Sequence, residues 1–247
     1  MVEKVIYVLV LLVGFSGCEY GYRYYADSLR PLDERGQEAG MTVSDDGTVT
    51  YLADRLEISV RPLSDEELNR QFPHQSVRGT ESTNPYTFGD WEDPSTGTTP
   101  RRFTVFRLKV KNYQYPKILI DPAKTQIVSD TGRTYSSLSQ LDVEEYYRKY
   151  ITGYVGRLYS TYQERKDLLK RTLYPGEVVF SGQENEGFIV FADLHPEVRR
   201  IRLRLDDVAL RFNFRDEPVE MVDIEYVFER EVGRYYSRSG RREPVEN

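Results

Sequence analysis

Cysteine and histidine are nearly absent from this sequence, which has one Cys and two His in 247 residues. One Cys cannot form a disulfide bond within the chain, and so few soft ligands argue against a structural zinc site. An excess of basic residues is missing too, because the formal net charge is −6. Nucleic-acid-binding domains are usually basic. The sequence therefore predicts neither a metal centre nor a nucleic-acid partner.

The usual catalytic motifs are missing as well. The chain has no Gly-x-Ser-x-Gly, no His-Glu-x-x-His and no glycine-rich phosphate loop. His74 and His195 lie in segments of loop composition, which favours surface histidines over catalytic bases. Asp130-Thr131-Gly132 is similar to the active-site triplet of aspartic proteases, but that chemistry needs two carboxylates that share a proton. The triplet occurs once, so we interpret it as a turn and expect no catalytic residue and no cofactor.

The amino terminus indicates where the protein resides. Residues 5–13 form an unbroken apolar run, too short to span a bilayer as a helix but typical of a signal peptide. Phe15-Ser16-Gly17-Cys18 then resembles the lipobox of bacterial lipoproteins, in which small residues precede a Cys that becomes lipidated. The only Cys of the chain stands at the one position where that pathway needs a thiol.

This resemblance implies removal of a signal peptide, residues 1–17, and acylation of Cys18 with chains such as palmitate. The mature protein would be anchored in the bilayer of a bacterial cell envelope, on the periplasmic or outer surface. The alternative is an ordinary buried Cys that follows an uncleaved anchor.

The two ends of the mature chain have little apolar periodicity. We expect residues 18–47 to be a lipid-proximal linker whose tyrosines rest at the level of the lipid headgroups, or else a first strand or docked arm. We expect residues 232–247 to be a flexible tail. The arginines from Arg230 to Arg242 would be solvated there, or would contact anionic headgroups.

Alternating apolar and polar residues dominate the region between these ends. Residues 106–110, 201–205 and 210–214 follow the period of half-buried strands, and in the last segment Leu210, Phe212 and Phe214 form the apolar set. Strands recur every 8–12 residues with turn signals between them, a pattern typical of a sandwich. Residues 73–101, rich in Pro, Gly, Ser and Thr, form a long loop in this interpretation. The fold class predicted for residues 48–231 is mainly β, an antiparallel β-sandwich.

Part of this region resembles a known kind of domain. A strand ending in Val110-Lys111-Asn112, a hairpin closing on Asp130-Thr131-Gly132, the turn around Pro175-Gly176-Glu177 and the strand Phe188–Phe191 occur in the order found in immunoglobulin-like domains of bacterial surface lipoproteins of unassigned function. The resemblance covers about half of the chain. It implies an immunoglobulin-like fold and a location, and it brings no activity and no site residues.

Residues 142–172 do not fit that pattern and predict a helical insertion. Tyr146, Tyr147, Tyr150 and Tyr154 cover a wider arc than a helix normally buries against a sheet. We therefore expect them to form the surface that contacts a partner, because exposed aromatic clusters mark contact sites. In the alternative, the insertion folds over the sandwich and buries every ring.

Function follows from these expectations only in broad terms. We expect a membrane-anchored envelope lipoprotein that is not an enzyme and acts as a binding or scaffolding module for an envelope protein or glycan. The alternative is a carboxylate-based hydrolase of envelope glycans that uses residues such as Asp206, Asp207 and Glu225. An acidic chain offers many such carboxylates by chance.

Overall fold

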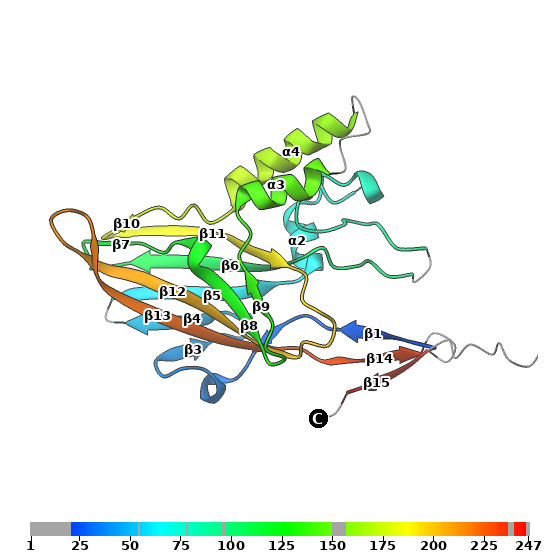
Figure 1. The fold of residues 1–247 in the computed structure, drawn as a ribbon, viewed down its shortest axis with the longest axis horizontal. Coiled ribbons are helices and arrows are strands. Elements are labelled where there is room, and N and C mark those ends of the chain that lie inside the picture. The colour runs from blue at the N-terminus through cyan, green and yellow to red at the C-terminus, as the bar shows by residue number, and fades with distance from the viewer. Residues whose placement is uncertain are drawn as a thin grey trace, which may run out of the picture.

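Two five-stranded antiparallel sheets pack against each other in the computed structural model of this chain (Figure 1). The structure describes residues 21–53, 55–77, 79–94, 97–149, 157–236 and 240–245. The first sheet has the order β11-β6-β5-β4-β3, formed by Gln183–Ala192, Phe103–Asn112, Leu56–Leu63, Val49–Ala53 and Met41–Val43. The second has the order β2-β13-β12-β8-β9, formed by Arg30–Pro31, Pro218–Glu229, Arg200–Phe212, Thr125–Ser129 and Thr134–Ser136.

The shorter elements lie around this sandwich. β7 (Lys117–Ile118) pairs with β10 (Val179–Phe180). β1 (Tyr22–Ala26), β14 (Val232–Tyr236) and β15 (Arg241–Pro244) form a separate three-stranded sheet, which we call the arm. The helices are η1 (Glu34–Gly36), α2 (Asp65–Gln71), η2 (Gly79–Glu81), η3 (Pro122–Lys124), α3 (Gln140–Arg148) and α4 (Arg157–Thr172).

The main core lies between the two large sheets and is built by the alternation seen in the sequence. Ile201, Leu203 and Leu205 of β12 are at most 1% exposed, whereas the arginines between them reach the surface. Across the sandwich, the Phe106 and Phe228 rings lie 5.3 Å apart. The predicted antiparallel β-sandwich with a helical insertion, α3 and α4 between β9 and β10, is confirmed.

A second core lies under the helices, on the outer face of β6 and β11. Phe103 and Val105 of β6 face this core, while Phe106 faces the main one, so the start of β6 is buried on both sides. The predicted long loop supplies Tyr86, which is fully buried, with its ring 5.3 Å from that of Phe188. Much of residues 73–94 is thus folded against the sandwich and is part of the core.

The segments expected to be a linker and a flexible tail both contain β-strands. Tyr22 pairs with Tyr236 and Ala26 with Val232, so the first described strand lies beside one of the last in the arm. Residues 30–31 and 41–43 also belong to the large sheets. The predictions of a linker over 18–47 and of a flexible tail over 232–247 are wrong for the described residues, because backbone pairing orders segments that lack an apolar pattern. Residues 1–17 and Cys18 lie outside the described residues.

Candidate functional site

The tyrosine surface expected on the insertion is in part a buried contact. Tyr147 is 2% exposed, and its hydroxyl donates to the Pro85 carbonyl oxygen at 2.7 Å. Arg102 donates to the same hydroxyl at 2.8 Å. Tyr146 is half-buried, with its ring 5.1 Å from that of Phe103. The prediction that Tyr147 contacts a partner is wrong, because the folded loop before β6 covers the face of α3 that carries it.

The remaining tyrosines of that prediction, Tyr150 and Tyr154, lie outside the described residues. The Tyr147 ring is contacted by two arginine side chains of this same chain. The guanidinium carbon of Arg165 lies 4.3 Å from the centre of the Tyr147 ring, and that of Arg102 lies 5.3 Å away. Arg102 also lies 3.8 Å from the Phe88 ring, so these contacts join α3 and α4 to the loop. They hold the helical layer in place.

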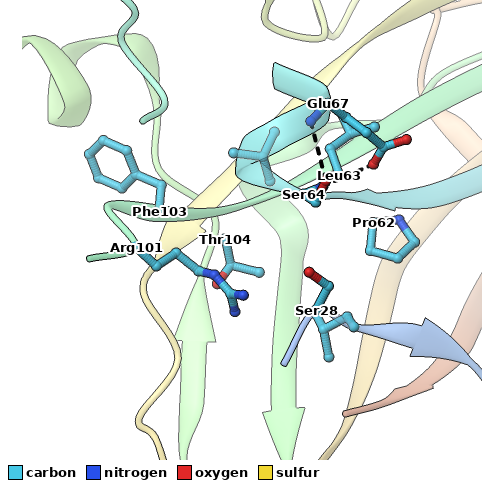
Figure 2. A pocket seen from close by; sticks show the side chains of 10 residues that line it. Ser28, Pro62, Leu63, Ser64, Glu67, Arg101, Phe103 and Thr104 are labelled. Carbon is cyan, nitrogen blue, oxygen red and sulfur yellow. Dashed lines mark hydrogen bonds between the residues drawn. The ribbon is translucent and has the colours of Figure 1, made fainter. Parts of the chain in front are cut away.

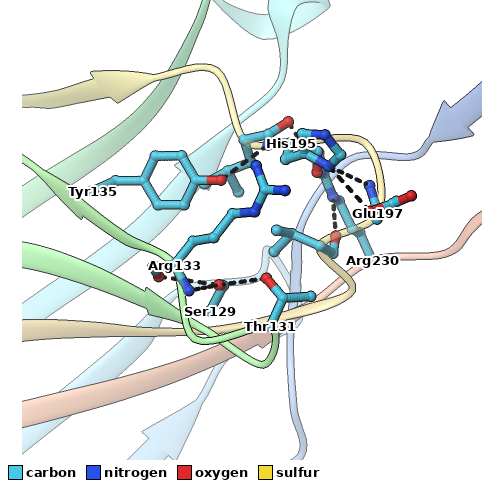
Figure 3. Close-up of polar contacts among 9 residues, drawn as sticks. Ser129, Thr131, Arg133, Tyr135, His195, Glu197 and Arg230 are labelled. Atoms are coloured by element: carbon cyan, nitrogen blue, oxygen red, sulfur yellow. Dashed lines mark hydrogen bonds and ion pairs between the residues drawn. The ribbon is translucent and has the colours of Figure 1, made fainter.

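The Asp-Thr-Gly triplet forms the turn between β8 and β9, as the sequence predicts (Figure 3). The Gly132 N–H donates to the Ser129 carbonyl at 3.0 Å, and the Ser129 and Thr131 hydroxyls lie 2.9 Å apart. The Asp130 carboxylate accepts the backbone N–H of Arg200 at 3.0 Å. The Asp130 carboxylate thus closes a turn onto β12.

Arg230 is buried beside this turn and binds backbone carbonyl oxygens, although the sequence predicts a solvated arginine. It is 4% exposed, and its guanidinium donates to the carbonyl oxygens of Val198 and His195 at 2.8 Å each (Figure 3). Burial, with Arg101 nearby, lowers the pKa of Arg230 to about 10. The backbone N–H of His195 donates to the Tyr135 hydroxyl at 3.1 Å. His195 thus lies in a loop that Arg230 holds against the sandwich.

A small cavity of about 60 Å³ lies where the β5–α2 junction meets the start of β6 (Figure 2). Arg101, Thr104 and Ser28 line it, and the buried Thr104 hydroxyl has no hydrogen-bond partner among the described residues. The volume is that of about two water molecules. Substrate pockets usually measure about 300–1,000 Å³, so this cavity is a poor candidate for an active site.

Two of the candidate carboxylates, Asp206 and Asp207, line one open groove of about 320 Å³. Asp206 accepts a hydrogen bond from the Gln126 amide at 2.5 Å, and Asp207 pairs with Lys124 at 2.8 Å. Glu225 does not line this groove. Within the described residues, no cluster of three or more His, Cys, Asp or Glu side chains is placed to hold a metal ion. In the same residues, no helix is both long and apolar enough to cross a membrane.

The most exposed large apolar side chain among the described residues is Phe214, which is 90% exposed in the turn between β12 and β13. The sequence pattern instead groups Phe214 with Leu210 and Phe212 on a core-facing stripe. Leu210 is buried and Phe212 is half-buried, but register shifts on either side of Arg211 break the alternation. Phe214 therefore lies in the turn, outside the strand.

Backbone and side-chain hydrogen bonds fix the conformation of this turn. The Asn213 N–H donates to the Glu217 carbonyl at 2.9 Å, and the Asn213 side-chain oxygen accepts the N–H groups of Arg215 and Glu217 at 2.8 and 3.0 Å. Asp216 has a φ of 63°, and its carboxylate forms an ion pair with Lys117 of β7. The turn is thus anchored to a second element, and Phe214 projects from its hydrogen-bonded backbone.

Other exposed apolar side chains lie on the elements around this turn. Phe180 of β10 is 52% exposed and pairs through its backbone with Lys117, the residue that holds Asp216. Val219 and Met221, at the start of β13, are 56% and 51% exposed. We call Phe214 with these three residues the hairpin end of the sandwich. The asparagine, the Arg-Asp-Glu run and the proline at 213–218 were the sequence signal for a turn there.

Two solved structures resemble this chain. No family model matches this chain, and no curated protein matches it. The crystal structure of the yjhA protein from Bacillus subtilis is similar over 71% of this chain and 93% of that chain, with 12% identity and a TM-score of 0.36. A secreted protein from Mycobacterium tuberculosis, MPT63, is similar over 67% of this chain and 91% of its own, with 8% identity and a TM-score of 0.30.

Proposed function

We propose that this chain is a lipid-anchored protein of the bacterial cell envelope that binds a protein partner through the hairpin end and catalyses no reaction. The observation that carries the binding role is Phe214, held 90% exposed on a turn that is hydrogen-bonded and ion-paired in place. Its anchor is Cys18, the only Cys of the chain, in a lipobox-like sequence.

An exposed aromatic side chain on a hydrogen-bonded turn is well suited to binding. Binding energy at protein interfaces is concentrated in a few anchors, often aromatic, that enter pockets of the partner. Because the turn backbone beneath the ring is already held in place, association has to order little beyond the Phe214 side chain itself. Because its ring carries no polar group, Phe214 fits an apolar pocket on a protein.

The position of the hairpin end also suits a tethered binding protein. Figure 1 shows the β12–β13 turn at one end of the long axis and the arm, which contains the first described strand, at the other. Cys18 precedes the arm by a few residues. Anchoring at Cys18 would therefore leave the hairpin end free to meet a partner away from the tether.

Two experiments test the two halves of this proposal. Mass spectrometry of the protein from native membranes should find residues 1–17 removed and Cys18 acylated. An intact Met1 or an unmodified Cys18 would refute the anchor. For the binding role, the tagged chain should co-purify from mild detergent with one stoichiometric protein.

A matched pair of variants makes the second experiment specific. Phe214→Ser should lose that partner, while Leu141→Ser, which changes a 71% exposed leucine on α3, should retain it. Both side chains are exposed, so both variants should keep the melting temperature of the parent. Equal binding by the two variants would exclude the hairpin end as the contact.

The alternative function, a carboxylate-based hydrolase of envelope glycans, is favoured by one observation. Asp206 and Asp207 share an open groove, and Asp207 has the unusual φ of 56° at an irregularity of β12. Strained residues of this kind cluster at active sites. Turnover of envelope glycan by the purified protein, abolished in Asp206→Asn and Asp207→Asn, would favour the enzyme over the binding module.

A further inference from the structure

The arm differs in composition from the rest of the chain. Its three strands contain four arginines and one glutamate, a net charge of +3, whereas the whole chain carries −6. They also contain five tyrosines. Tyrosine and arginine together are the residue types that favour the boundary between lipid headgroups and water.

The strand register places both residue types on both faces of the arm. Directly paired residues share a face, so Tyr22, Tyr24, Arg234 and Tyr236 lie on one side with Arg241. Arg23, Tyr25, Tyr235 and Arg242 lie on the other.

Rings and guanidinium groups are neighbours on each face. The guanidinium carbon of Arg234 lies 4.9 Å from the centre of the Tyr22 ring, and that of Arg242 lies 5.2 Å from the Tyr25 ring. Such contacts hold the cations beside the aromatic rings.

Much of this surface is open to solvent. The arm extends beyond the end of the sandwich (Figure 1), and Arg23, Arg241 and Arg242 are exposed. Tyr24 is 40% exposed. The acidic side chain of the arm, Glu243, is engaged by the Tyr236 hydroxyl at 2.9 Å and lies 3.7 Å from Arg241. Arg23 and Arg242 have no carboxylate within ion-pair distance among the described residues.

The segment between Cys18 and the arm is short enough to limit how far the arm can lie from the lipid anchor. Tyr22, the first residue of β1, follows Cys18 by four residues. An extended chain of that length reaches at most about 14 Å. If Cys18 is acylated, as the proposed function requires, the arm has to lie close to the headgroups of the membrane that holds the lipid.

We infer that the arm is a membrane-contacting element that binds anionic phospholipid headgroups. Arg23 and Arg242 attract the headgroups, and the partly exposed Tyr25 and Tyr235 rings on the same face lie at the boundary between lipid and water. The arm thereby fixes the sandwich against the membrane by a second contact, in addition to the lipid anchor.

The test uses residues 19–247, which lack Cys18 and contain every strand and helix described above. Sedimentation measures partition into vesicles of phosphatidylcholine, either pure or with about 30% phosphatidylglycerol. The chain should bind the anionic vesicles and not the neutral ones, and added salt should weaken binding because it screens charges. Equal partition into both kinds of vesicle, or none into either, would overturn the inference.

Variants locate the contact. Each arginine near an anionic surface contributes about fivefold in affinity, so Arg23→Gln with Arg242→Gln should lower partition roughly 25-fold. Arg211→Gln with Arg215→Gln removes the same charge beside the hairpin turn and should lower it less than about twofold. If both double variants lost the same amount of vesicle binding, net charge alone would explain the binding, and the arm would have no specific role. Because the probe lacks Cys18, this result is independent of whether the native protein is acylated.

Discussion

Tyr25 of β1 lies directly across from Gly233 of β14, and its ring fills the space that a side chain at position 233 would need. A Cβ there would lie 2.6 Å from Cε1 of Tyr25 and 2.5 Å from the Glu243 carbonyl oxygen of β15. The Tyr25 hydroxyl donates to Glu231 at 2.7 Å, which restrains the ring. Close packing of the three strands of the arm therefore requires glycine at this position.

Replacing this glycine should loosen the arm and leave the sandwich intact. In Gly233→Ala, the new methyl group forces Tyr25 or the β15 backbone to move. Hydrogen exchange at the amides of β1, β14 and β15 should accelerate at least about tenfold, which corresponds to about 1.4 kcal/mol of local stability. The amides of β6 are the internal control and should exchange as in the parent. Unchanged exchange in the arm would contradict the close contact.

Arg230 should be a major determinant of stability despite its position near the carboxyl end. Arg230→Met removes the donor to the Val198 carbonyl oxygen and one of the two donors to the His195 carbonyl oxygen, so we expect a loss of about 2–4 kcal/mol in the free energy of unfolding. Arg230→Lys should recover only part of this, because an ammonium group cannot reproduce the planar fork. Urea denaturation measures both. A matched change at the exposed Arg215, to Met, should stay within about 0.5 kcal/mol.

The two faces of the helical layer should respond differently to truncation of a tyrosine. Tyr147→Ala empties a buried site and removes two hydrogen bonds, so we expect a loss of about 3–5 kcal/mol. Tyr159→Ala changes a ring on α4 that is 58% exposed and should cost less than about 0.5 kcal/mol. Thermal unfolding followed by circular dichroism compares them. Similar losses would mean that Tyr147 is not the core residue described above.

Stability should fall as the pH rises through the titration of Asp65. Burial raises the pKa of this carboxyl to about 6, and the nearby Arg101 only partly offsets the effect. In the unfolded chain the pKa is about 3.9. The folded state therefore binds more protons between these pH values, and the favourable contribution of protonated Asp65 is lost as the pH rises from about 4 to 7.

A charge-removing variant isolates this contribution. Relative to Asp65→Asn, the parent should lose about 1–2 kcal/mol of unfolding free energy between pH 4 and pH 7, since partial exposure screens the carboxylate. Asp193, whose pKa is raised in the same direction by burial, is present in both proteins. Parallel stability curves for the two proteins would contradict the raised pKa of Asp65.

Alternation of apolar and polar residues correctly predicted which side chains are buried where a strand buries only one face. Ile201, Leu203 and Leu205 are buried as their alternation predicts. The same rule failed at Phe214, because irregularities in β12 change which face a residue occupies. Periodicity depends on an unbroken register, and the sequence alone does not show where it breaks.

The arm and the buried Tyr147 could not be predicted from local pattern for a different reason. Tyr22 pairs with Tyr236, and Tyr147 is covered by Pro85, so each contact joins segments far apart in the chain. Arg230 likewise gains its role from a loop more than thirty residues earlier. Composition at the two ends indicated an interface with lipid, but only the pairing shows that these residues share one sheet.

The pairing of β1 with β14 also dictates the order in which the molecule can be completed. Tyr22 is synthesised long before its partner Tyr236. A contact this distant in sequence has a large loop-closure cost unless the intervening sandwich is already folded. The arm is therefore the last part to assemble, and until then β1 presents unpaired backbone groups to any other strand. A chain ending before Val232 would carry this open edge permanently, with the risk of aggregation that unpaired strands bring.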